Sequence, residues 1–263
     1  MNTKKNFGYG IFAVVLTLAF AALSLTGCPD EPGSDDPGTS GTPGLEYQLI
    51  NGDTAYSVKK GTVTDGKVVI PATYNDLPVT QIGDNAFQNY KSLTSVTIPS
   101  SVTWVGHAAF YGCTGLTSIT IPSSVTVFGN HAFTQCTSLK SITIPASVMS
   151  IGYGAFADCT SLTGITIPAG VTYIGWDAFI NCTSLTSITI PAGVRWVGER
   201  AFANCTSLTS ITIPASVEDI GERAFEGWTD TQTINVPWSS GNKPDDWSDE
   251  WDTNCDAQIV YQE

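Results

Sequence analysis

Charged residues and histidine are scarce in this chain. Asp, Glu, Lys and Arg make up 13% of its 263 residues, and there are two histidines. Acidic residues outnumber basic ones by 24 to 11, which gives a formal net charge of −13. Proteins that bind nucleic acid need basic surfaces that neutralise phosphates. We therefore expect no nucleic-acid partner.

The sequence also lacks the residue groupings that catalysis and metal binding require. No nucleophile lies in a recognisable motif, and there is no Gly-rich phosphate loop. Two histidines without a third ligand make a weak metal site. Between residues 102 and 216 the only acids are Asp158, Asp177 and Glu199, and nothing pairs them as hydrolytic carboxylates. We expect no enzyme activity, no cofactor and no metal.

Long apolar runs are absent except near the N-terminus. Two lysines precede an apolar run over residues 11–25, which has the length of a signal-peptide core and is too short to span a bilayer. The run ends in Leu-Thr-Gly-Cys, with Cys28 last, which resembles the bacterial lipobox. The resemblance implies a lipoprotein signal peptide over residues 1–27 and a diacylglycerol on the Cys28 thiol that anchors the protein to a membrane. An ordinary cleaved signal followed by a chance cysteine is the alternative.

The next segment, over residues 28–44, contains the lipidated cysteine and a stretch of Pro, Gly, Ser, Thr and Asp. Such a composition cannot bury a core, so we predict a disordered tether. Its root-mean-square reach is about 20–25 Å.

From Val79 onward the sequence repeats every 23 residues. Six copies and a degenerate seventh start at Val79, Val102, Val125, Val148, Val171, Val194 and Val217. One copy is too small to bury a core alone, so neighbouring copies must stack into a solenoid. We assign the solenoid to residues 79–237.

Within one copy, the pattern Leu116-x-x-Ile119-x-Ile121 predicts a short strand with its isoleucines inward and its hydroxyl residues outward. The following Pro122 ends that strand. The repeated glycine, Gly106 in this copy, indicates a positive φ or a close approach between backbones. A recurrent Ala-Phe pair predicts a buried column of Phe rings, in a segment with room for one helical turn.

The full pattern VxxIGxxAFxxCxSLxxITIP closely resembles the leucine-rich repeats of BspA-like bacterial surface proteins. The resemblance covers all seven copies. It implies a leucine-rich-repeat solenoid of mainly parallel β structure with short helical turns and about seven repeats. It also implies an N-terminal cap over residues 45–78 and a C-terminal cap over residues 238–263, which protect the open ends of the stack. Its functional implication is a binding or adhesive protein on a cell surface.

Seven cysteines are present, and five share one repeat position: Cys113, Cys136, Cys159, Cys182 and Cys205. The first and last copies place Tyr90 and Trp228 there, which indicates an apolar slot. We interpret the five as buried free thiols that act as small apolar side chains. Disulfides between neighbouring copies are the alternative in an exported protein. Cys255 is assigned to the core of the C-terminal cap.

Three repeat positions vary freely between copies and are rich in Trp and Tyr, which packing does not require there. The first column is Gln81, Trp104, Val127, Ser150, Tyr173, Trp196 and Asp219. The second is Asp84, His107, Asn130, Tyr153, Trp176, Glu199 and Glu222. The third is Gln88, Tyr111, Thr134, Ala157, Ile180, Ala203 and Glu226. Rigid aromatics on a polar surface anchor many interfaces. The predicted ligand-binding residues are therefore Trp104, His107, Tyr111, Tyr153, Tyr173, Trp176 and Trp196, unless these side chains simply lie flat over the turns.

Rows of Ser and Thr follow the predicted strands, with Thr97, Thr120, Thr143, Thr166, Thr189 and Thr212 in one row. Such rows match an ordered lattice such as ice or a glycan polymer. Alternatively, Thr is there for strand propensity and solubility.

Together these features favour a lipid-anchored binding protein of the cell envelope, at the outer membrane or cell surface rather than the inner membrane. The leading hypothesis is an adhesin for host, matrix or other-cell proteins. The alternatives are a carbohydrate-binding module and a non-adhesive envelope scaffold. The expected partner is a protein or glycan outside the cytoplasm.

Overall fold

The computed structural model describes residues 41–239, 244 and 247–262, which belong to one compact unit. The predicted signal peptide, the lipidation site at Cys28 and most of the tether lie outside the described residues. No helix in the described part of the chain has the length and hydropathy needed to cross a membrane.

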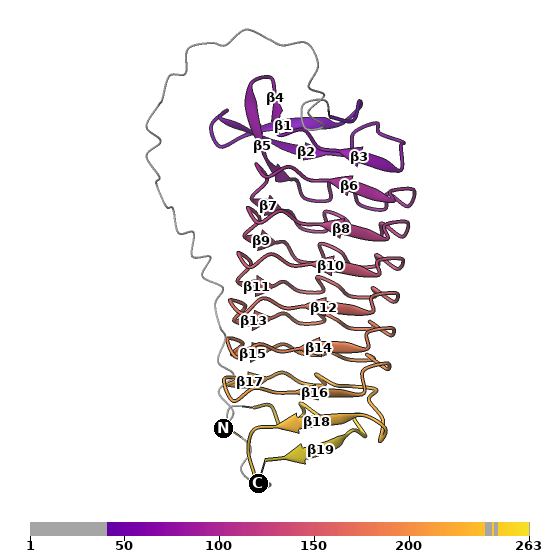
Figure 1. Ribbon diagram of the computed structural model, residues 1–263, viewed down its shortest axis with the longest axis vertical. Coiled ribbons are helices and arrows are strands. Elements are labelled where there is room, and N and C mark those ends of the chain that lie inside the picture. The colour runs from indigo at the N-terminus through magenta and orange to yellow at the C-terminus, as the bar shows by residue number, and fades with distance from the viewer. Residues whose placement is uncertain (1–40, 240–243, 245–246, 263) are drawn as a thin grey trace, which may run out of the picture. The chain divides into compact units, whose positions relative to one another are not determined.

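The repeats stack one on another as the turns, or rungs, of a solenoid, and their strands form two parallel columns along the stack (Figure 1). Each rung contributes one three-residue strand and one two-residue strand. The three-residue strands form what we call the long-strand face: β6 (Ser95–Thr97), β8 (Ser118–Thr120), β10 (Ser141–Thr143), β12 (Gly164–Thr166), β14 (Ser187–Thr189) and β16 (Ser210–Thr212). The two-residue strands form the short-strand face: β7 (Trp104–Val105), β9 (Val127–Phe128), β11 (Ser150–Ile151), β13 (Tyr173–Ile174), β15 (Trp196–Val197) and β17 (Asp219–Ile220).

Strand register equals the sequence repeat. In the long-strand face Ile142 pairs with Ile119 on one side and Ile165 on the other. These isoleucines are buried, whereas the flanking Ser141 and Thr143 are exposed. The alternation follows from the two-residue period of a strand. The predicted solenoid of parallel strands is therefore confirmed.

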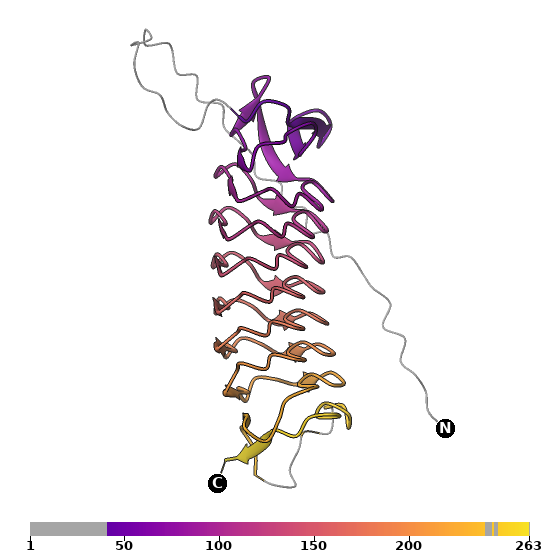
Figure 2. The same ribbon diagram turned by 90° about the vertical axis from the view of Figure 1, so that its right-hand side faces the viewer.

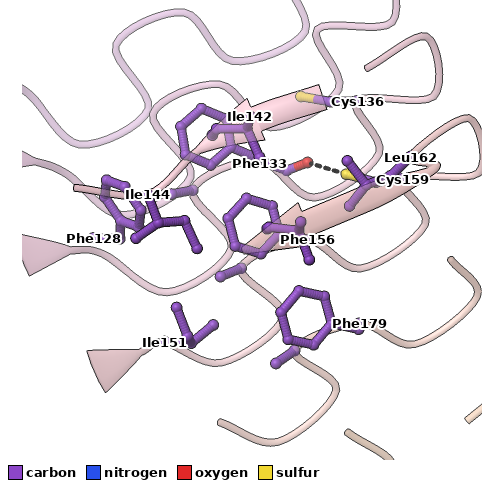
Figure 3. Packing of buried hydrophobic residues seen from close by; sticks show 14 of the residues in the cluster. Phe128, Phe133, Cys136, Ile142, Ile144, Ile151, Phe156, Cys159, Leu162 and Phe179 are labelled. Atoms are coloured by element: carbon purple, nitrogen blue, oxygen red, sulfur yellow. Dashed lines mark hydrogen bonds between the residues drawn. The ribbon is translucent and has the colours of Figure 1, made fainter. Parts of the chain in front are cut away.

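The core contains a continuous column of stacked Phe rings (Figure 3). Phe156 lies 5.6 Å from Phe133 and 5.5 Å from Phe179 between ring centroids, and the rings are within 9° of parallel. All seven repeat Phe residues are fully buried: Phe87, Phe110, Phe133, Phe156, Phe179, Phe202 and Phe225. The stacking confirms the predicted Phe column.

The segment around each Phe is not the short helical turn that the sequence suggested. The described residues contain no helix, because alternate amides donate to the neighbouring rung instead of to their own chain turn. The amides of Asn85 and Phe87 donate to the carbonyls of His107 and Ala109, at 2.8 and 2.7 Å. An α-helix would require bonds four residues back along the same segment.

Two left-handed residues in each rung make this arrangement possible. The first set is Asn85, Ala108, His131, Gly154, Asp177, Arg200 and Arg223; the second is Asn89, Gly112, Gln135, Asp158, Asn181, Asn204 and Gly227. The repeated glycine, two residues before the first set, has ordinary φ. Glycine is required there because the backbones of neighbouring rungs approach closely: a Cβ on Gly129 would lie 2.4 Å from the backbone nitrogen of His107. Of the two predicted roles for this glycine, close approach is therefore the one observed.

The N-terminal end is closed by β1 (Glu46–Ile50), β2 (Ala55–Lys59), β3 (Lys67–Val69), β4 (Thr73–Tyr74) and β5 (Leu77–Ile82). β1 runs antiparallel to β2, and β5 continues into the short-strand face by pairing with β7. The predicted boundary between the N-terminal cap and the solenoid lies between residues 78 and 79, inside β5. The cap and the first rungs of the solenoid therefore belong to the same β-sheet.

The C-terminal end carries two further parallel strands, β18 (Thr233–Val236) and β19 (Gln258–Tyr261), below the last rung (Figure 2). The buried Trp247 and Trp251 contact each other edge to face, with ring centroids 5.6 Å apart. Trp251 also meets Phe225, the last ring of the Phe column, at 5.9 Å. Aromatic side chains of the C-terminal cap thus cover the core at the last rung.

Candidate binding face

The first variable column lies along the outer side of the short-strand face. Six of its seven members are the first residues of the two-residue strands, and Gln81 is the last but one residue of β5. In every case the following residue points inward and is buried. Tyr173 and Trp196 are register partners on β13 and β15, and Trp104 pairs with Val127. Trp196 and Val127 keep 43% and 46% of their surface exposed. The structure therefore places three of the seven predicted residues in one outward row.

The second variable column follows three residues later and begins with polar side chains that accept hydrogen bonds. The Asp84 carboxylate accepts from the His107 amide at 2.7 Å. His107 Nδ1 accepts in turn from the Asn130 amide at 3.0 Å, and Asn130 Oδ1 accepts from the Tyr153 amide at 3.1 Å. His107 thus has a structural role in joining rungs, in addition to its exposed position. The shared acceptor chemistry of Asp, His and Asn was the sequence signal for this role.

The same column continues with an aromatic pair. Tyr153 and Trp176 stack with centroids 5.0 Å apart and planes 11° from parallel. Trp176 remains 46% exposed. The structure therefore brings Tyr153 and Trp176 together beside Tyr173 and Trp196, and we call these four residues the aromatic strip.

Tyr111 does not join the aromatic strip. It belongs to the third column, beyond the buried Phe110, where Thr134, Ala157 and Ala203 are buried at 6%, 6% and 1% exposure. Thr134 Oγ1 donates to the Gly154 carbonyl, which binds this column to the next rung. Three of the seven residues of the third column are therefore packing positions, whereas Gln88 at its start is exposed.

A groove opens where the aromatic strip meets the C-terminal cap. It has a volume of about 350 Å³ and is lined by Trp176, Glu199, Asp219, Gly221, Glu222 and Ser248. Arg200 pairs with Asp177, with 2.9 Å between Nε and Oδ1, and its Nε lies 3.7 Å from Glu199 Oε1. One guanidinium is therefore shared between two carboxylates at the edge of this groove.

The five repeat cysteines are buried and free. Each thiol donates to a Phe carbonyl of the preceding rung; Cys159 Sγ lies 3.2 Å from the Phe133 oxygen (Figure 3). In the last copy Trp228 Nε1 makes the equivalent bond to Phe202 at 2.9 Å. Burial raises the pKa of Cys113, Cys159 and Cys205 from 9.0 to about 12. Thiols with so high a pKa are poor nucleophiles and poor metal ligands at neutral pH.

The remaining titratable groups of the described residues do not form a metal centre. No group of three or more His, Cys, Asp or Glu within the described ranges has the geometry to hold an ion. His131 lies on the adjacent rung to His107, and its Nδ1 is 3.3 Å from Thr134 Oγ1.

The long-strand face contrasts with the aromatic strip in composition. Its Ser and Thr side chains are exposed on each three-residue strand, and Gly164 interrupts the Ser row in β12. The Thr row runs unbroken from β6 to β16.

Comparison with known families agrees with this architecture. The model of the BspA type leucine rich repeat region matches six copies, over residues 68–184 and 172–243. The chain belongs to the BspA-type leucine-rich repeat family. Its parallel solenoid is therefore of the leucine-rich-repeat type, as the repeat pattern predicted.

Solved structures of leucine-rich repeat proteins resemble it. A T. pallidum leucine-rich repeat protein is 31% identical with a TM-score of 0.64, over 70% of this chain and 85% of that one. A leucine-rich repeat protein from Eubacterium ventriosum is 26% identical with a TM-score of 0.53, over 74% of this chain and 51% of that one. A leucine-rich cell surface protein from Faecalibacterium prausnitzii is 28% identical, over 79% of this chain and 78% of that one, with a TM-score of 0.43. No curated protein sequence matches the chain.

Proposed function

We propose that this protein is a lipid-anchored adhesin of the cell envelope whose short-strand face binds a protein outside the cytoplasm. The observation that supports this most directly is the aromatic strip. Two of its side chains lie on the outer side of β13 and β15, and two lie in the turns that follow β11 and β13. The core positions beside them are uniform from copy to copy, so packing does not account for the aromatic residues. Large, rigid aromatics are enriched at the energetic centres of protein interfaces.

Family membership supports a binding role over catalysis. Repeat solenoids present extended surfaces on which neighbouring rungs contribute side chains to one interface. The signal-peptide pattern and the lipobox-like sequence at Cys28 support export and lipid anchoring at the outer membrane or cell surface. The Pro- and Gly-rich segment after Cys28 would hold the solenoid away from the membrane.

Binding is tested by screening residues 28–263, carrying Cys28→Ser, against matrix proteins, cell-surface proteins and glycan arrays. We expect a protein ligand whose affinity falls about tenfold or more in a Trp104→Ala/Trp196→Ala variant, since central aromatics often contribute 2 kcal/mol or more. The matched control is Thr143→Ala/Thr166→Ala on the long-strand face, which should leave the affinity unchanged.

The outcomes separate the candidate functions. Loss of binding in the Thr variant alone would indicate that the ligand binds the Ser and Thr rows of the long-strand face. A glycan bound in place of a protein would favour the carbohydrate-binding alternative, and no ligand at all would favour an envelope scaffold. Anchoring is tested separately by labelling cells with a palmitate analogue, which a Cys28→Ala variant should not incorporate, and by protease accessibility on intact cells.

A further inference from the structure

We propose that the groove at the C-terminal end of the short-strand face is a receptor for an arginine or lysine side chain on a basic segment of the partner protein. This inference rests on the proposed function and specifies the chemistry of the ligand. The groove combines an exposed indole, Trp176, with the carboxylates of Glu199, Asp219 and Glu222.

The indole is held in place with one face covered. Tyr153 stacks on it at 5.0 Å from the preceding rung, and its Cδ1 lies 2.5 Å from where a Cβ on Gly198 would be. Any larger residue than glycine at position 198 would displace the ring. Trp176 keeps 46% of its surface exposed, and Glu199 is the next member of its column, one rung further along the stack. An exposed indole beside a carboxylate is suited to a cation.

Carboxylates follow the indole along the stack. Glu199 and Glu222 are the next two members of the second column, and Asp219 is the last member of the first column, on β17. Arg200, at the edge of the groove, makes two contacts of 2.9 Å to Asp177 and lies farther, at 3.7 Å, from Glu199. The groove lining contains three carboxylates and, among the described residues, no Lys or Arg.

The charge distribution of the chain points to the same occupant. Residues 217–263 contain 12 acidic and 2 basic residues, a net charge of −10, whereas residues 102–216 contain three of each. Half of all the acids in the chain are thus in its last 47 residues. The described residues from 217 onward contain nine of these acids and one base, Arg223. A field of that sign attracts basic partners and raises their association rate. Within that field, the groove supplies the specific contacts.

A guanidinium fits this arrangement well. It stacks flat on aromatic rings and donates in a planar fork to carboxylates. The groove volume of about 350 Å³ accommodates one such side chain and part of its stem, with the rest of the segment lying across β15 and β17.

The test uses a fluorescein-labelled ten-residue peptide with three arginines in a Gly/Ser background, measured by fluorescence anisotropy on the mature chain. A citrulline peptide of the same length is the neutral control, because citrulline keeps the shape of arginine and loses its charge. We expect the arginine peptide to bind more tightly, with an affinity that falls as salt rises. Equal affinity for both peptides, or no binding of the arginine peptide, would overturn the proposal.

Two variants locate the site. Glu199→Gln/Asp219→Asn/Glu222→Gln should weaken the arginine peptide about tenfold, through the loss of three charge contacts. The matched control removes three negative charges outside the groove at the same C-terminal end of the protein, at Asp230→Asn, Asp252→Asn and Asp256→Asn, and should change affinity less than about twofold. An equal loss in both would show a general field effect and no groove.

The indole is tested by Trp176→Leu, which retains apolar packing on Tyr153 and removes the ring. Peptide affinity should fall about two- to fivefold, the range for an exposed cation–π contact, and Trp176→Phe should restore part of it. An unchanged affinity in Trp176→Leu would also overturn the proposal. The proposed adhesin function fails independently if the arginine peptide occupies the groove but no matrix or cell-surface protein binds the chain.

Discussion

The long-strand face and the short-strand face are built on the same rungs, yet their surfaces differ. Both have buried aliphatic positions inside and exposed positions outside. On the long-strand face the exposed positions are nearly uniform Ser and Thr, whereas on the short-strand face they range from Trp to Asp. The exposure of a repeat position therefore does not by itself decide whether its residue varies between copies. On the long-strand face Thr suits the exposed side of a regular strand, whereas the variable positions of the short-strand face lie on strands of only two residues.

The largest expected effect tests the core that both faces share. Buried Cys113, Cys159 and Cys205 have their pKa raised to about 12, so folding favours the protonated thiol. Their stabilisation is fully present below pH 9 and is lost as the pH rises toward 12. Each thiol should lower the free energy of unfolding by up to about 1.4 kcal/mol per pH unit in that window.

Urea unfolding from pH 8 to pH 11 measures this loss. The Cys159→Ala variant should show a shallower decline, by the equivalent of one proton. Identical slopes for the variant and the parent protein would contradict the assigned burial of that thiol.

Removal of one ring from the Phe column is the next largest effect. Phe156→Ala should destabilise the protein by about 3–5 kcal/mol, because a cavity opens between Phe133 and Phe179. Thr166→Ala on the long-strand face should change stability by less than about 1 kcal/mol. Urea denaturation followed by far-ultraviolet circular dichroism measures both, and similar losses would mean that the Phe column is not the shared support of the two faces.

Moving the exposed Trp residues to the long-strand face tests whether their position on the solenoid matters for binding. When Thr143→Trp and Thr166→Trp are added to the Trp104→Ala/Trp196→Ala variant, the number of exposed indoles is restored on the wrong face. We expect the roughly tenfold loss of ligand affinity to persist. Recovery of affinity in a surface plasmon resonance assay would show that the ligand recognises exposed indole without regard to its position.

The smallest effect concerns the left-handed positions. Ala108 has φ of 51°, which costs an L-residue about 1 kcal/mol or more. Ala108→Gly should therefore raise the free energy of unfolding by about 0.5–1 kcal/mol. The control Ala169→Gly, in an exposed turn with ordinary φ, should lower it, and the same sign for both would argue against strain at Ala108.

The sequence alone predicted the parallel strands, their register and the Phe column, because apolar residues recur at fixed spacing. It did not predict the conformation around Phe, where Ala108, Arg200 and Arg223 adopt positive φ without being glycine. Those residues are held there by hydrogen bonds to the neighbouring rung, which no local pattern reveals. All four residues of the aromatic strip were among the predicted ligand-binding residues. Tyr111 was predicted with them, but it follows the buried Phe110 in the third column and is not part of the strip.

The interchange of Asp84, His107 and Asn130 as acceptors for the next amide has an evolutionary consequence. Junctions that tolerate unlike side chains allow a whole unit to be duplicated or deleted by recombination between near-identical gene segments, without redesign of its neighbours. Each such event would lengthen or shorten the molecule by one step of about 4.8 Å. The distance between the N-terminal cap and the groove at the C-terminal end would then change in steps of one rung.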